Sequence, residues 1–164
     1  MGPRNRGPDG GNHMRNLAAV LAVTACLTPA SGALAPVNAL GALAVGETAG
    51  GVAKDGVAMG TAWNYSSQDE ANSAALKNCH DYKPAPQAAK ECKLVGTLNA
   101  KQCYAIAMDP KAGTPGVGWA IADDKPTAQS QALANCKVTA GVEREQYCAI
   151  AESNCDGQKN DGQK

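Results

Sequence analysis

Cysteine is the residue type in this sequence that offers the most chemistry. The chain has 164 residues and 7 cysteines. Cys26 lies in the apolar stretch that predicts a leader and would be removed with it. Six cysteines then remain: Cys79, Cys92, Cys103, Cys136, Cys148 and Cys155. An even number of cysteines in an exported chain predicts a disulfide framework. Six cysteines allow fifteen pairings, so the number alone leaves the connectivity open. The alternative is that some thiols stay free in a reducing compartment.

Catalytic and metal-binding chemistry has little support. Cys79-His80 places a thiol beside an imidazole, but sequence neighbours at a helix end rarely have the geometry of a nucleophile and its base. Zinc favours clustered ligands such as C-x₂-C, which the chain lacks. We therefore expect no catalytic residue, no metal and no other cofactor, and a protein that is not an enzyme.

Other polar motifs have structural explanations. Asp123-Asp124 precedes Pro126, which predicts a helix N-cap and first turn rather than an acid pair. Gly50-Gly51 lacks the pattern of a phosphate-binding loop. Glu143-Arg144-Glu145 predicts a solvated turn, and Asn64-Tyr65-Ser66 is a formal glycosylation sequon that a bacterial type of leader makes irrelevant.

Composition excludes further functions and indicates a thin core. Lys+Arg and Asp+Glu are both 15, which argues against a basic nucleic-acid binder and an acidic solvating tail. Aromatic residues are 4% and phenylalanine is absent. A core with so few large side chains needs covalent support, which the predicted disulfides would supply.

The first 33 residues predict export. An apolar stretch, Leu17–Leu27, follows Arg15 and leads to small residues up to Ala33, as in a secretory signal peptide cleaved after Ala33. Residues 1–13 are polar and rich in Gly and Pro, so Met14 is the expected true start, with a long n-region as the alternative. Two competing hypotheses are a membrane span and a lipoprotein anchored through Cys26.

Residues 34–155 are expected to form one domain built twice, with repeat one about 40–102 and repeat two about 103–155. Alternating residues predict strands near 40–45, 57–63, 92–98, 103–108, 117–122 and 147–152. Two Ala-rich helices end at cysteines; Ser67 with Glu70 fits a capping box for the first, and Asp124 caps the second. The order is ββαβ, twice, and residues 156–164, which contain DGQK twice, are expected to be disordered.

The fold class that follows is α+β: internally duplicated ββαβ units, two short helices on a mixed or antiparallel sheet, stapled by disulfides. Each helix presents an alanine face to the small side of its strands, and the other repeat is the simplest cover for the large side. If both copies fold alike, each helix-end cysteine meets the cysteine before the following strand. That predicts Cys79–Cys92 and Cys136–Cys148 and leaves Cys103–Cys155.

Trp63 and Trp119 are the two tryptophans and are assigned to equivalent positions of the repeats. The simpler interpretation is that they fill the core. The functional alternative is a paired aromatic platform, which makes them the candidate binding surface.

The repeated pattern resembles the bacterial exported family known as domain of unknown function 4189. The resemblance rests on Gly41–Val45, Trp63, Ser67–Cys79 with Cys92, and Cys103–Met108, followed by Trp119, Asp124–Cys136 and Cys148–Ala151. It covers about residues 40–155 and implies a small secreted or periplasmic protein without an established catalytic mechanism.

The function that we expect is that of a secreted or periplasmic, non-enzymatic binding module. Its partner would be another protein or a component of the cell envelope, without nucleic acid and without a membrane span after processing. The alternative is a small disulfide-rich enzyme inhibitor or an immunity-type protein.

Overall fold

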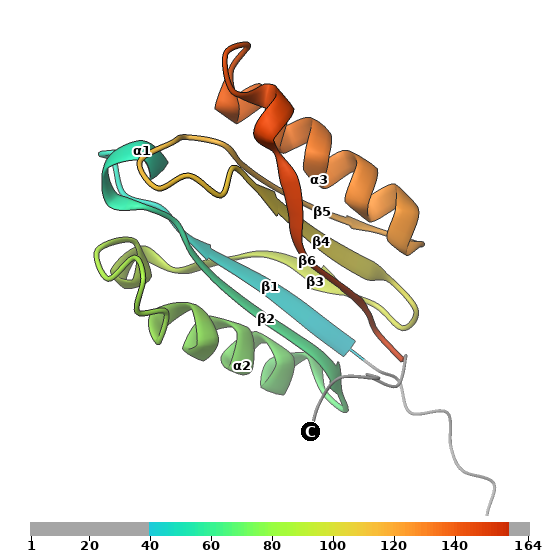
Figure 1. Ribbon diagram of the computed structural model, residues 1–164. Coiled ribbons are helices and arrows are strands. Elements are labelled where there is room, and N and C mark those ends of the chain that lie inside the picture. The colour runs from blue at the N-terminus through green and yellow to red at the C-terminus, as the bar shows by residue number, and fades with distance from the viewer. Residues whose placement is uncertain (1–39, 158–164) are drawn as a thin grey trace, which may run out of the picture. The chain divides into compact units, whose positions relative to one another are not determined.

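The computed structural model describes residues 40–157 (Figure 1). The predicted signal peptide, Met14 and Cys26 lie outside these residues. The elements in chain order are β1 (Leu40–Gly46), α1 (Val52–Asp55), β2 (Ala58–Tyr65), α2 (Gln68–His80), η1 (Ala88–Glu91), β3 (Lys93–Leu98), β4 (Cys103–Met108), β5 (Val117–Ala122), α3 (Lys125–Ala140), η2 (Glu145–Tyr147) and β6 (Ala149–Cys155). No helix within 40–157 is long and apolar enough to cross a membrane.

The strands form two antiparallel sheets of three strands each, with the orders β2-β1-β3 and β5-β4-β6. Each sheet is completed by a strand that follows its own long helix, so both repeats have the order ββαβ. The predicted α+β class and the predicted duplication are thereby confirmed.

Small residues bring each long helix close to its sheet. α2 covers the alanine face of its sheet and α3 covers that of the other sheet (Figure 1). A Cβ added at Gly60 would lie 2.1 Å from the carbonyl oxygen of Ala75, and one at Gly118 would lie 2.3 Å from the amide nitrogen of Cys136. Glycine is therefore required at both places because the helix backbone occupies the space of a side chain.

The large faces of the two sheets pack against each other. Leu43, Val45, Leu98, Tyr104 and Ile106 are buried between them. The Trp63 ring on β2 lies 5.7 Å from the Tyr104 ring on β4. The arrangement has four layers, helix, sheet, sheet and helix, and each repeat covers the face that the other would leave exposed (Figure 1).

Both long helices begin at the predicted residues. The Ser67 side chain accepts a hydrogen bond from the Glu70 amide at 3.2 Å, and Asp124 accepts one from the Thr127 amide at 2.8 Å. The capping box is incomplete because the Glu70 carboxylate accepts a hydrogen bond from the Ser66 hydroxyl instead of reaching back to Ser67.

Three disulfides join the pairs that the repeat predicts. Cys79–Cys92 and Cys136–Cys148 each connect the last part of a long helix to the residue before the following strand. Cys79 is next to the last residue of α2, whereas α3 continues one turn beyond Cys136 to Ala140, so the predicted end of the second helix at its cysteine is wrong. Cys103–Cys155 links directly paired residues of β4 and β6. The first two bonds are internal to one repeat each, and the third closes repeat two from its first strand to its last.

The assignment of Trp63 and Trp119 to equivalent positions is wrong by two residues. Leu43 pairs with Thr61, and its counterpart Ile106 pairs with Trp119. Thr61 is thus the counterpart of Trp119, and Trp63 is the counterpart of Ile121. The number of residues between each tryptophan and the following cysteine is nearly the same in both repeats and hides this shift. The register of the strand pairs reveals it.

Three smaller expectations also need correction. The segment between the first two strands, for which no helix was predicted, contains the short helix α1. The last strand starts later than expected, because residues 145–147 form η2, and it continues to Cys155. Asp156 is only 1% exposed, so the expected disorder is wrong for the first residue of that segment; residues 158–164 lie outside the described part.

Candidate functional site

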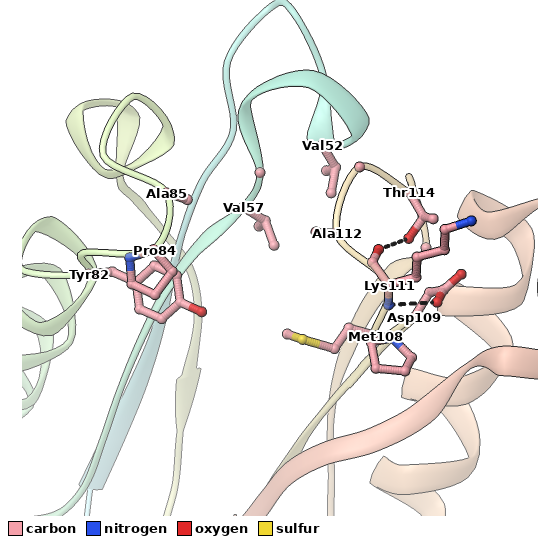
Figure 2. Close-up of a pocket in the computed structure, with 14 residues that line it drawn as sticks. Val52, Val57, Tyr82, Pro84, Ala85, Met108, Asp109, Lys111, Ala112 and Thr114 are labelled. Atoms are coloured by element: carbon pink, nitrogen blue, oxygen red, sulfur yellow. Dashed lines mark hydrogen bonds between the residues drawn. The ribbon is translucent and has the colours of Figure 1, made fainter.

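A cleft lies where the first loops of the two repeats meet. Its volume is about 290 Å³. The β1–β2 connection with α1 forms one side, the segment after α2 a second, and the β4–β5 loop a third (Figure 2). The lining residues are Val52, Gly56, Val57, Tyr82, Pro84, Ala85, Met108, Asp109, Pro110, Lys111, Ala112, Gly113, Thr114 and Gly116.

The first loop is shaped by glycines and by one carboxylate. Gly51 and Gly56 flank α1 with φ values of 80° and 75°, a conformation that residues with a side chain rarely adopt. The Thr48 hydroxyl donates to Asp55 and accepts a hydrogen bond from the Gly50 amide at 3.1 Å. These bonds close the turn that carries Val52 to the rim of the cleft.

The β4–β5 loop is anchored by an ion pair. Both carboxylate oxygens of Asp109 accept hydrogen bonds from the Arg144 guanidinium, at 2.5 and 2.9 Å. One of them also accepts the Lys111 amide at 3.0 Å, and the Thr114 hydroxyl donates to the Lys111 carbonyl at 2.7 Å. The base of the β4–β5 loop is therefore held by Arg144, a residue of the same repeat.

The surroundings of Asp109 hold its carboxyl group in the ionised form near neutral pH. Its side chain is buried, and the hydrogen bonds from Arg144 are the main reason that its pKa falls to about 2. Arg144 in turn lies over the Tyr147 ring at 4.6 Å. A carboxylate that stays ionised and paired with Arg144 is suited to anchor the loop and has no proton to donate.

The interior of the cleft is mostly apolar. Val52, Val57 and Met108 point into it, and the Tyr82 hydroxyl is directed toward it (Figure 2). The Lys111 ammonium group points away from the cleft (Figure 2). Such a site can accept an apolar group with a single polar contact, which is the usual character of a small binding pocket.

A second polar cluster lies between the sheets. The Tyr104 hydroxyl donates to the Glu152 carboxylate and accepts from the Asn154 amide at 3.1 Å; Thr61 also donates to Glu152 at 3.3 Å. Burial is the main cause that raises the pKa of Tyr104 well above its ordinary value. Since Thr61 belongs to the other sheet, the cluster joins the two repeats.

The structure separates the residues that the sequence singled out. Cys79 is in a disulfide, and Nδ1 of His80 lies 2.6 Å from the Ala89 carbonyl oxygen, an arrangement that links α2 to η1. Trp63 and Trp119 pack against the layer between the sheets. Neither tryptophan lines the cleft, whose residues come from loops and from the last residue of β4, Met108, without a sequence motif.

Arg144 is the residue whose role sequence reasoning missed. It belongs to the segment predicted as a solvated turn, yet its side chain is only 25% exposed and holds Asp109. One signal was available, because Arg144 is the single arginine after Arg15. Bidentate binding of a buried carboxylate favours arginine over lysine.

Metal binding finds no support in residues 40–157, which contain no group of three or more His, Cys, Asp or Glu side chains that could hold an ion. In the same residues, the polar clusters at Asp109 and Tyr104 contain no nucleophile beside a base.

Comparisons with known proteins identify a family. No curated protein matches the chain. The NMR structure of Rv1813c from Mycobacterium tuberculosis is similar at 17% identity and a TM-score of 0.41, covering 91% of this chain and 100% of that one. The family described as domain of unknown function (DUF4189) matches residues 40–155. The chain therefore belongs to the DUF4189 family.

Proposed function

We propose that the protein is an exported, non-enzymatic binding module that receives an apolar group of its partner in the cleft between the two repeats. The partner would be another protein or a component of the cell envelope. The observation that carries this proposal is the cleft itself, to which both repeats contribute a loop.

The covalent framework supports the exported part of the proposal. Six cysteines form three disulfides. Disulfides form and persist in oxidising compartments and are rare where thiols are kept reduced. The disulfides thereby support a secreted or periplasmic location, with the predicted signal peptide as the proposed route.

The construction of the cleft supports binding rather than catalysis. Its one carboxylate, Asp109, is neutralised by Arg144, and its inward side chains are aliphatic apart from Met108 and Tyr82. Hydrogen bonds from Arg144 and the Lys111 amide to Asp109 hold the base of the β4–β5 loop, which lowers the entropy cost of ordering this part of the rim on binding.

The enzyme inhibitor remains the second candidate, and one observation favours it. In the β4–β5 loop, Lys111, Ala112 and Gly113 are exposed, while Asp109 fixes the base of the loop. Inhibitors present such rigid, exposed loops to the site of an enzyme. In that case the captured partner is an enzyme, and its activity falls when the protein binds.

The test is a pull-down from the native cell envelope with the oxidised protein. Ala112 is exposed at the rim, so Ala112→Trp should fill the cleft without disturbing the core. Ala100 is also exposed, in the β3–β4 turn and outside the cleft, so Ala100→Trp is the matched control. We expect a partner that wild type and Ala100→Trp capture and Ala112→Trp loses. A partner that all three retain would contradict the cleft as the binding site.

A further inference from the structure

Three residues, Asn64, Asp156 and Gly157, form a clasp between the two repeats. Asp156 follows β6 directly, and its Oδ1 atom accepts a hydrogen bond from the backbone amide of Asn64 in β2 at 2.6 Å. The side-chain oxygen of Asn64 in turn accepts the Gly157 amide at 2.7 Å. The end of repeat two thus holds the last part of β2, at the opposite end of that strand from α1 and the cleft (Figure 1).

The carboxyl group of the clasp is buried without a charged partner. Asp156 is 1% exposed, and its second oxygen, Oδ2, is buried with no hydrogen-bond donor among residues 40–157. This oxygen faces β1, since a Cβ added at Gly41 would lie 3.2 Å from it. The ion pairs of the described residues involve other carboxylates. A buried carboxylate needs a cation or several hydrogen bonds, and one amide donor gives it neither.

The charged and titratable groups of the neighbouring elements do not supply a partner. They are Tyr65, Lys101, Tyr104, Asp123 and Glu152, while β1 contributes none. Tyr104 and Glu152 are bonded to each other, and Asp123 accepts the Gln102 side-chain amide at 3.1 Å. Burial raises the pKa of Asp156, the Asn64 amide lowers it by less, and none of the five groups acts on it.

Two features allow the clasp to open by itself. Asn64 has a φ of 64°, a left-handed conformation that costs energy for a residue with a side chain, so opening relieves strain. The Cys103–Cys155 disulfide lies directly before Asp156 and keeps the end of β6 on β4. Opening therefore separates the repeats at this end and leaves the sheet of repeat two paired.

We propose that the clasp is a pH-sensitive contact between the repeats, closed while the Asp156 carboxyl group holds its proton and released when that proton passes to the solvent. The protonated group keeps its bond to the Asn64 amide and has no charge to desolvate. The ionised group is stabilised by opening, because water then reaches both of its oxygens.

The direction of this dependence follows from the two states. An open clasp has an exposed carboxyl group with the ordinary pKa of 3.8, and burial raises that pKa in the closed clasp. Between these two values the ratio of open to closed clasp rises about tenfold for each pH unit, because opening releases one proton. The clasp is thus tightest in acid and loosens toward neutral pH, above the window in which Asp109 acts.

Amide hydrogen exchange of the oxidised full chain, followed by NMR as the pH is raised from about 4 to about 8, tests the proposal. The protection factor compares each amide with an unstructured peptide at the same pH. We expect the protection of the Asn64 and Gly157 amides to fall by up to about tenfold per pH unit. The amide of Ala105, in the centre of β4, should not change. Carbon-13 NMR should show the Asp156 carboxyl group titrating over the same range.

Asp156→Asn isolates the proton. Its side chain keeps an oxygen for the Asn64 amide and cannot ionise, so the clasp should stay protected at every pH. Asp123→Asn changes an exposed carboxyl group that follows β5 at the same end of the molecule, and it should keep the wild-type dependence. Equal pH dependence in Asp156→Asn and the wild type overturns the proposal. The wild type alone also overturns it if Asp156 titrates at 3.8 or if clasp protection is constant while Asp156 titrates.

Discussion

At the scale of single residues, the buried pair of Asp109 and Arg144 decides how the cleft is held. Asp109 follows β4 directly, and Arg144 lies just before η2, so their ion pair ties the turn between α3 and η2 to the β4–β5 loop. Two hydrogen bonds in a fork geometry fix orientation as well as distance. The loop that carries Ala112 to the rim thus depends on a residue far along the sequence.

This pair predicts a dependence of stability on pH. A carboxyl group whose folded pKa lies below its ordinary value of 3.8 stabilises the fold above that value, and the contribution disappears as pH falls toward the folded pKa of about 2. The free energy of unfolding should therefore decrease between pH 4 and pH 2, in that window set by Asp109. Urea unfolding across this window measures it.

Asp109→Asn is the matching variant. It should unfold more easily at neutral pH and lose part of the decrease between pH 4 and pH 2, because the amide does not titrate. Asp156 acts in the opposite direction, since burial raises its pKa. A variant with the full acid slope of the wild type would show that Asp109 does not carry this dependence.

At the scale of elements, much of the fold could be predicted because the local patterns agree with the tertiary structure. β4 and β5 begin and end at the predicted residues, since small and large residues alternate cleanly along both strands. β6 could not be delimited, because Glu152 and Asn154 are polar residues whose partner is the Tyr104 hydroxyl. A buried polar contact of this kind interrupts the alternation of apolar and polar residues by which a strand is predicted.

The cleft could not be predicted at all. It depends on how the faces of two sheets meet, which brings Val57 and Met108 to one site. The helix α1 was missed because it has only four residues, between glycines. The loops that line the cleft converge only because the two repeats pack together, and no local sequence pattern encodes that packing.

The glycines under the helices provide a prediction at this scale. Gly60→Ala and Gly118→Ala should each destabilise the protein by about 1–3 kcal/mol or more, because a Cβ would meet helix backbone. Gly96→Ala is the matched control, since its Cβ would meet only the side chain of Ile121, whose terminal Cδ1 atom can move. Thermal and urea unfolding give the comparison. Equal losses at all three positions would contradict close helix packing as the cause.

At the scale of the whole molecule, the core consists of two thin clusters under the helices and one layer between the sheets. Three disulfides add covalent support to it. The alanine-rich clusters under the helices contain few large side chains. In the chain-entropy description, the bonds with separations of 13 and 12 residues each contribute about 3 kcal/mol, and the bond with a separation of 52 about 4 kcal/mol. Ordinary domains have about 5–15 kcal/mol in total.

Reduction of the three disulfides should therefore leave the protein largely unfolded. Replacing Cys136 and Cys148 together with alanine should lower the free energy of unfolding by about 3 kcal/mol, as should replacing Cys79 and Cys92. Urea unfolding with and without reductant measures both effects, and non-reducing peptide mapping checks the pairs. A reduced protein with the spectrum and the urea midpoint of the oxidised protein would mean that the hydrophobic core alone keeps the chain folded.

The central claim is that the partner binds where the two repeats meet, and photocrosslinking in the intact cell envelope tests it most directly. A benzophenone amino acid is placed at position Ala112, on the rim of the cleft, and at position Ala100, in the β3–β4 turn. The account predicts one discrete adduct from the first position and none from the second. Equal adducts from both positions, or an adduct from the second alone, would contradict it.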